Sequence, residues 1–186
     1  RGFRIVSNNV DEFDLLFKEK PSNTYMSYEK ICALLRGREF PPLIVMAHLP
    51  GAEWSVDCLA DRGKLLYALP RRRLKMQGGI SVNAELEDNP AIVKRSAEIC
   101  KVLGLHGNIG IQFKADENDI PQILEINPRL QGSIVLCAAA GVNLPYFGLL
   151  LHLGREVPRV KPRFGLRMYR FWDEVYFDAA GHSSSY

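Results

Sequence analysis

Two oxygen-bearing side chains in the second half of the chain stand at a spacing that could hold a hard metal ion. Glu125 and Asn127 follow the apolar pair Ile123 and Leu124, and these apolar residues predict a strand. The period of two along a strand then points both polar side chains to one face. Carboxylate and amide oxygens are ligands that Mg²⁺ accepts. The spacing by itself also fits an ordinary strand end whose Glu and Asn face solvent.

A third oxygen and a cation can join this pair. If a hairpin loop is centred near Asn118 and Asp119, Gln112 on the preceding strand lies opposite or next to Glu125. Such a sparse ligand set would be completed by water and by the phosphates of a nucleotide. Arg129 follows closely, and its guanidinium is suited to bidentate contact with a transferred phosphoryl group. The chemistry that these residues suggest is phosphoryl transfer.

Composition excludes several other classes of protein. The chain has 186 residues, 47% hydrophobic and 24% charged, which is typical of a soluble globular protein. A formal charge of +3 gives no field that demands nucleic acid. The longest apolar stretch, residues 134–153, is interrupted by Gly and Pro, so we expect a buried helix and no membrane span. The four separated cysteines (Cys32, Cys58, Cys100 and Cys137) predict reduced core residues of a cytoplasmic protein, and no histidine stands at ligand spacing.

The apolar patterns and turn residues predict a chain of mixed strands and helices. We expect strands over residues 3–7, 43–49, 54–60, 64–70, 79–86, 108–115 and 121–127, and one or two closing strands in 164–177. Helices are expected after Asn8 or Asn9, over 27–36, from Pro90 to Gly104, and over 133–140 and 144–153. Because hairpins dominate, the sheet should be antiparallel and the fold class α+β.

The sequence resembles a known family over residues 1–155. Gln112-Phe113-Lys114, followed by Leu124-Glu125-Ile126-Asn127-Pro128-Arg129, resembles the metal-binding hairpin of the ATP-grasp superfamily, and most of all the ATP-binding domains of the carbamoyl-phosphate synthase large chain. The resemblance continues through residues 49–57, 70–73, 78–82 and 138–145. Residues 1–6 resemble the exit of the glycine-rich loop that covers the nucleotide phosphates. This implies that the N-terminal ATP-grasp portion is missing.

The resemblance implies a fold and an activity. It implies an α+β ATP-grasp C-terminal subdomain over residues 1–160, mostly antiparallel sheet flanked by helices, then closing strands over 161–180 and a frayed tail over 181–186. It implies a ligase that uses ATP and Mg²⁺ (or Mn²⁺) to convert a carboxylate or bicarbonate into an acyl phosphate, which an amine or ammonia then attacks. Two alternatives stay open, a non-catalytic nucleotide-binding module and an inactive fragment.

The resemblance also implies roles for individual residues. Gln112, Glu125 and Asn127 would bind the metal, and Arg129 would be catalytic, facing the transferred phosphoryl group. The backbone of Ala47 and Leu49 would bind adenine, although relatives often carry Glu in place of Ala47. Glu53 would bind the ribose hydroxyls, and the loop with Gly79 and Ile80 would approach nucleotide or substrate.

Some features keep two interpretations. The loop with Gly79 and Ile80 also fits a plain turn into a strand. The basic run Arg71, Arg72 and Arg73 fits either a group that neutralises an acyl phosphate or carboxylate, or a solvated face. The aromatic residues of 171–177 fit either a contact surface or the core packing of a final strand.

Overall fold

The computed structural model describes residues 4–9 and 25–184. The chain divides into two compact units, Arg1–His48 and Leu49–Tyr186. Each unit is described by itself.

The first unit contains one helix and a small parallel strand pair in its described part. Strand β1 (Ile5–Val6) pairs with β2 (Tyr25–Met26), and helix α2 spans Tyr28–Leu35. The Ser27 hydroxyl caps α2 by accepting the N–H of Lys30 at 3.3 Å, so the helix predicted over 27–36 is confirmed. The helix predicted after Asn8 or Asn9 falls on residues 10–24, outside the described residues.

The buried strand predicted over residues 43–49 is wrong. The segment has no regular structure, and its apolar side chains from Leu43 to Met46 are exposed, with Val45 92% accessible. A β-strand is stable only where a neighbouring strand takes its backbone hydrogen bonds. This segment pairs with no strand in the described part of the chain. An apolar run alone therefore does not make a strand.

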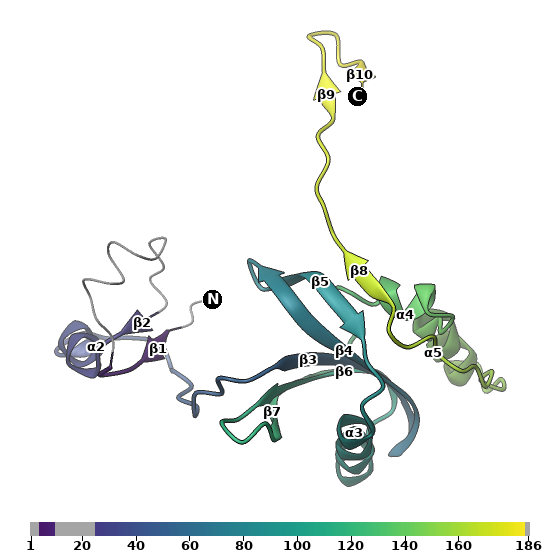
Figure 1. Cartoon of the computed structure of the whole chain (residues 1–186), viewed down its shortest axis with the longest axis horizontal. Helices are drawn as coiled ribbons and strands as arrows, with labels where there is room; N and C mark the ends of the chain where they lie inside the picture. The colour runs from purple at the N-terminus through teal and green to yellow at the C-terminus, as the bar shows by residue number, and fades with distance from the viewer. Residues whose placement is uncertain (1–3, 10–24, 185–186) are drawn as a thin grey trace. The chain divides into compact units, whose positions relative to one another are not determined.

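The second unit is built on a six-stranded sheet in the order β7-β6-β3-β4-β5-β8 (Figure 1). Each neighbouring pair is antiparallel, so the predicted α+β class with an antiparallel sheet is confirmed. The strands are β3 (Glu53–Asp61), β4 (Lys64–Gln77), β5 (Ile80–Leu86), β6 (Gly107–Ala115), β7 (Pro121–Asn127) and β8 (Arg167–Tyr169).

The β4–β5 hairpin closes through a two-residue turn. Gln77 pairs with Ile80, and Gly78 and Gly79 between them have φ of 57° and 80°. A tight hairpin turn of this kind needs positive φ at both central residues, which glycine adopts without steric cost. The Gly-Gly pair therefore determines where the chain reverses.

Helices cover both faces of the sheet (Figure 1). On one face lies α3 (Pro90–Leu103), the helix predicted from Pro90 to Gly104, which packs on Val56, Cys58 and Ile111. The Asn89 side chain caps this helix by accepting the N–H of Ile92. On the other face, residues of α4 (Val135–Ala139) and α5 (Leu144–His152) pack with Leu59 and Leu69. Successive residues of β3 point to opposite faces, so one strand contributes to both cores.

The cysteines are free thiols. Cys58, Cys100 and Cys137 are buried, as the sequence predicts, whereas Cys32 is half-buried. Among the described residues, no helix has the length and apolar character needed to cross a bilayer.

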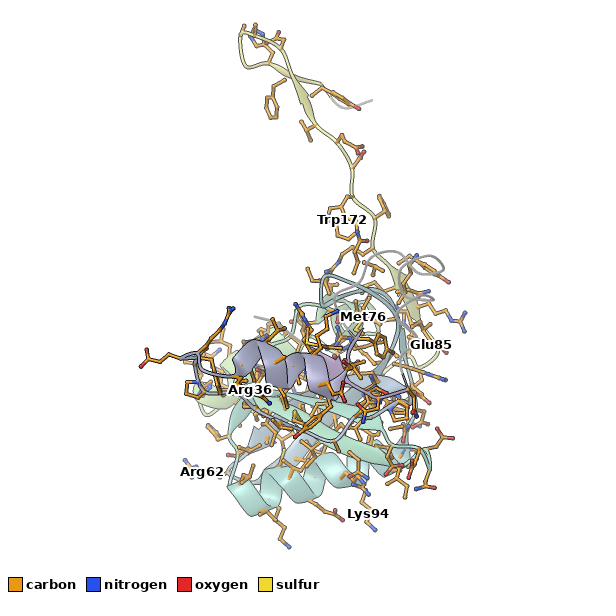
Figure 2. The ribbon with its side chains drawn as sticks, turned by 90° about the vertical axis from the view of Figure 1, so that its left-hand side faces the viewer. Arg36, Arg62, Met76, Glu85, Lys94 and Trp172 are labelled. Carbon is orange, nitrogen blue, oxygen red and sulfur yellow. The ribbon has the colours of Figure 1, made fainter. Side chains whose placement is uncertain are left out.

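The C-terminal segment differs from the prediction in two ways. Strand β9 (Tyr176–Phe177) pairs with β10 (Ser183–Ser184), so the predicted frayed tail is wrong for residues 183–184. Core packing of the aromatic residues is also wrong, because Phe171 is 82% accessible and Trp172 is exposed on the extended segment before β9 (Figure 2). These side chains meet too little apolar surface here to form a core.

Candidate functional site

A polar patch occupies one face of the sheet beyond the α4–α5 core. The apolar residues Trp54 and Val56 of β3 pack toward α3, so Glu53 and Asp57 point to the opposite face. The same alternation in the neighbouring strands adds further polar side chains to this face. The patch consists of Glu53, Ser55 and Asp57 from β3, Arg71 and Arg73 from β4, Gln112 from β6, and Glu125 and Asn127 from β7.

Gln112, Glu125 and Asn127 come together as the sequence predicts. Gln112 pairs directly with Glu125 in the β6–β7 ladder. Asn127 donates its Nδ2–H to Glu125 Oε1 at 2.7 Å, which leaves the amide oxygen of Asn127 as an acceptor. This donor set is one carboxylate and two amides. No group of three or more His, Cys, Asp or Glu side chains with metal-binding geometry occurs among the described residues.

This oxygen set fits a magnesium ion that arrives with a nucleotide. Mg²⁺ is commonly held by one or two carboxylates, with water and substrate phosphates in the other positions. Glu125 is solvent-exposed and Asn127 half-buried, so their oxygens are open to a ligand. With a single carboxylate, a magnesium site of this kind would rely on phosphate oxygens for the rest of its negative charge.

Arg129 lies just beyond β7. Its backbone N–H donates to the carbonyl of Asn127 at 2.8 Å, which turns the chain sharply after the strand. Its guanidinium donates from Nη1 to the carbonyl of Leu130 at 3.1 Å and is otherwise exposed. Its other donors contact none of the described residues, so they are available to an anion.

The basic run divides between the two faces of β4. Arg72, which pairs with Trp54, is exposed, whereas Arg71 is buried and Arg73 is only 8% accessible. A solvated face is therefore the wrong interpretation for Arg71 and Arg73. Strand alternation explains the division, because Arg72 alone points away from the polar patch.

Arg71 forms a buried ion pair with Asp57 that was not expected from the sequence. The side chains are 0% and 1% accessible, and the second Nη group of Arg71 donates to the hydroxyl of Ser133. Asp57 Oδ1 accepts the backbone N–H of Gln131 at 3.3 Å. The pair therefore connects two central strands to the loop between β7 and α4. The sequence signal that could have revealed this ion pair is an acidic residue within the apolar strand β3, together with an arginine in the neighbouring strand β4.

Burial has the largest effect on the pKa values of Asp57 and Cys137 in this network. Burial raises the pKa of Asp57, while the charge of Arg71 and the hydrogen bond from Gln131 lower it. Burial also raises the pKa of the Cys137 thiol to about 12. Cys137 therefore stays protonated at neutral pH, and its Sγ can donate to Asp57 Oδ2 at 3.7 Å.

The remaining predicted nucleotide ligands lie in different settings. Glu53 forms an ion pair with Arg73, and the carbonyl of Gly79 accepts Arg73 Nη2 at 2.6 Å. Ile80 is exposed at the start of β5. Leu49 is half-buried at the start of the second unit, and Ala47 is exposed in the first unit.

Comparison with known proteins agrees with this fold. The profile of the family described as "ATP-grasp in the biosynthetic pathway with Ter operon" matches residues 39–172. The phosphoribosylaminoimidazole carboxylase ATPase subunit from Aquifex aeolicus is 17% identical, with a TM-score of 0.56 over 67% of this chain and 41% of its own.

The biotin carboxylase domain of the Hydrogenobacter thermophilus 2-oxoglutarate carboxylase is also 17% identical. Its TM-score is 0.50, over 62% of this chain and 28% of its own. The chain thus spans less than half the length of either protein. At these identities the likeness shows the fold alone.

Proposed function

This chain belongs to the ATP-grasp family, and from that premise we propose that it is the metal-carrying part of an ATP- and Mg²⁺-dependent ligase of carbamoyl-phosphate-synthase-like type. The enzyme forms an acyl phosphate from a carboxylate or bicarbonate, which an amine or ammonia then attacks. The observation that carries this proposal is the β6–β7 register, which pairs Gln112 with Glu125 on the same face as Asn127.

The ribose and the phosphates of the nucleotide are assigned to the polar face of the sheet in the second unit. Glu53 accepts hydrogen bonds from the ribose hydroxyls, and the backbone near Ala47 and Leu49 binds adenine. The turn with Gly79 and Ile80 approaches the nucleotide or substrate, because glycine has no side chain to keep the backbone at a distance. The exposed guanidinium of Arg129 is assigned to the transferred phosphoryl group.

Gln112, Glu125 and Asn127 would hold Mg²⁺ (or Mn²⁺). When bound, the ion neutralises phosphate charge and orients the transferred group. Because the chain supplies one carboxylate at this position, metal affinity without nucleotide should be low. Metal and nucleotide are therefore expected to bind together.

The chemistry needs no nucleophile from the protein. A carboxylate oxygen of the acceptor forms a bond to the γ-phosphorus of ATP, and the bond from that phosphorus to the bridging oxygen breaks to release ADP. The amine nitrogen then attacks the acyl carbon, phosphate leaves, and the nitrogen loses a proton. Arg129 offsets the charge on the transferred oxygens, so the protein acts by positioning and electrostatics.

The experiment is ADP release by the full-length protein with MgATP and a panel of acceptors. The panel contains bicarbonate, amino acids and small dicarboxylates; bicarbonate is included because the Hydrogenobacter thermophilus domain is in complex with MgADP and bicarbonate. Hydroxylamine captures acyl phosphates of organic acids as hydroxamates, which report the intermediate directly.

The proposal predicts acceptor-dependent ADP release, lowered at least about 100-fold in Arg129→Met, the range that removal of one charge-stabilising donor produces. Nucleotide binding with no ADP release for any acceptor would contradict catalysis and favour the non-catalytic binding module.

A further inference from the structure

Arg73 connects four groups on the polar face through one guanidinium. Nε donates to Ser81 Oγ at 3.0 Å, and Nη2 donates to the carbonyl of Gly79 at 2.6 Å. Nη1 forms the ion pair with Glu53 Oε1 and lies 3.5 Å from Gln112 Oε1. These partners come from β3, β5, β6 and the β4–β5 turn.

The donors of Arg73 are almost fully occupied. A guanidinium has five N–H groups, and the four contacts use four of them. The side chain is 8% accessible, so an incoming anion would meet few free donors. This argues against Arg73 as the group that neutralises an acyl phosphate. Its contacts are those of a residue that holds other site residues in place.

The residue that Arg73 holds most directly is Glu53. The Glu53 side chain is 12% accessible, and its Oε1 is engaged by Arg73. Within the described part of the chain, Oε2 accepts no hydrogen bond and can receive a donor from a ligand. A carboxylate fixed before binding loses less conformational freedom when the ligand arrives, so its hydrogen bond contributes more to affinity.

We propose that Arg73 is a positioning residue, which orients Glu53 so that the site distinguishes a ribonucleotide from a deoxyribonucleotide. This inference rests on the proposed function, in which Glu53 binds the ribose hydroxyls. A site built to hydrogen-bond a hydroxyl discriminates against an analogue that lacks it, because the acceptor is left unpaired. Arg73 acts on that discrimination through Glu53 and touches no reacting atom.

The test compares MgATP with the magnesium complex of 2′-deoxy-ATP by calorimetry on the full-length protein. One hydrogen bond to a charged acceptor corresponds to a preference for ATP of about 10- to 100-fold. Arg73→Met should bring the ratio of the two affinities, ATP over 2′-deoxy-ATP, close to one. Arg73→Lys should restore part of the preference for ATP. Arg72→Met is the matched control, because Arg72 precedes Arg73 in β4 and points to the other face.

A second comparison separates positioning from general stability. In a Glu53→Gln background, Arg73→Met should leave the remaining ratio unchanged, since the group through which Arg73 acts is already altered. Equal weakening of both nucleotides by Arg73→Met, with an unchanged ratio, would show a merely structural role and overturn the inference.

The two failures are distinguishable. A wild-type protein that binds both nucleotides equally overturns this inference and the assignment of Glu53 to the 2′-hydroxyl, but leaves the proposed ATP-dependent ligase activity intact. A wild-type protein that binds neither nucleotide overturns both. Circular dichroism checks the fold of every variant, and if Arg73→Met does not fold, Arg73→Lys and Glu53→Gln decide through the same ratio.

Discussion

Removal of Arg71 should destabilise the second unit more than most single substitutions. Arg71→Met keeps most of the side-chain volume but leaves the carboxylate of Asp57 buried without its charged partner. Breaking a buried ion pair by removing one member costs about 3–5 kcal/mol. The Ser133 hydroxyl also loses its donor, which supports the upper part of this range. At about 2–4 °C per kcal/mol, the melting temperature should fall by about 10 °C.

The double variant Asp57→Asn/Arg71→Met isolates the charge. The asparagine side chain removes the unpaired carboxylate and keeps an oxygen that can accept the N–H of Gln131. Because a buried pair can be replaced by neutral groups at little cost, the double variant should recover about 2 kcal/mol or more of the loss. Urea unfolding followed by circular dichroism measures each variant at one pH.

The pH dependence of the stability of Arg71→Met gives an independent check that the unpaired carboxylate of Asp57 causes the loss. Burial already raises the pKa of Asp57, and Arg71→Met removes the largest influence that lowers it. Between the ordinary carboxyl pKa of 3.8 and the raised folded value, the folded variant binds more protons than the unfolded chain. The stability of the variant therefore falls as pH rises through that window, so its deficit is largest at neutral pH. A loss below about 1 kcal/mol, or a double variant no better than the single one, would refute the reasoning.

Two further substitutions test the β6–β7 turn and the close approach of Gly51 to Ala115 at the end of β6. Hydrogen bonds from Gln122 and from the N–H groups of the β6–β7 turn lower the pKa of Asp116. The stability that Asp116 contributes should therefore be present above the ordinary carboxyl pKa of 3.8, and it should be lost as pH falls through the lower pKa of the folded state. The stability difference between wild type and Asp116→Ala, followed by urea unfolding, should accordingly shrink in acid; a difference independent of pH would contradict this. Gly51→Ala should cost about 1–3 kcal/mol, because the new Cβ would lie 2.6 Å from the Cβ and 2.9 Å from the carbonyl oxygen of Ala115. Gly132→Ala, where nothing lies within 4 Å, is its control, and equal melting temperatures for the two variants would count against the close approach.

Local signals in the sequence were sufficient to predict most helices and strands of the second unit. The Arg62-Gly63 turn and the Asn89 cap each act within a few residues, so the hairpin of β3 and β4 and helix α3 appear where expected, although β4 continues beyond the predicted residue 70 to Gln77. The Gln112–Glu125 pairing also followed from local information, since the position of the loop determines the register. These elements form the candidate metal site.

The errors arose where the outcome depends on distant partners. The apolar residues 43–46 fit a strand by composition, yet a strand needs a neighbour that composition does not reveal. The pairing of Asp57 with Arg71 depends on adjacent strands and on the approach of the loop before α4. No pattern along the chain encodes that approach. The aromatic residue Phe171 likewise fitted a core strand by type and is exposed.

The most direct test of ATP chemistry at this face is calorimetric binding of ATP to the full-length protein, with Mg²⁺ or with EDTA. Glu125→Gln removes the single carboxylate of the β6–β7 set, and Glu117→Gln in the neighbouring turn is its control. We predict binding that needs Mg²⁺, weakened at least about tenfold by Glu125→Gln with the fold intact, and unchanged in Glu117→Gln. Equal affinity in wild type and Glu125→Gln, or binding that EDTA does not alter, would contradict the assignment of the metal and its nucleotide to this site.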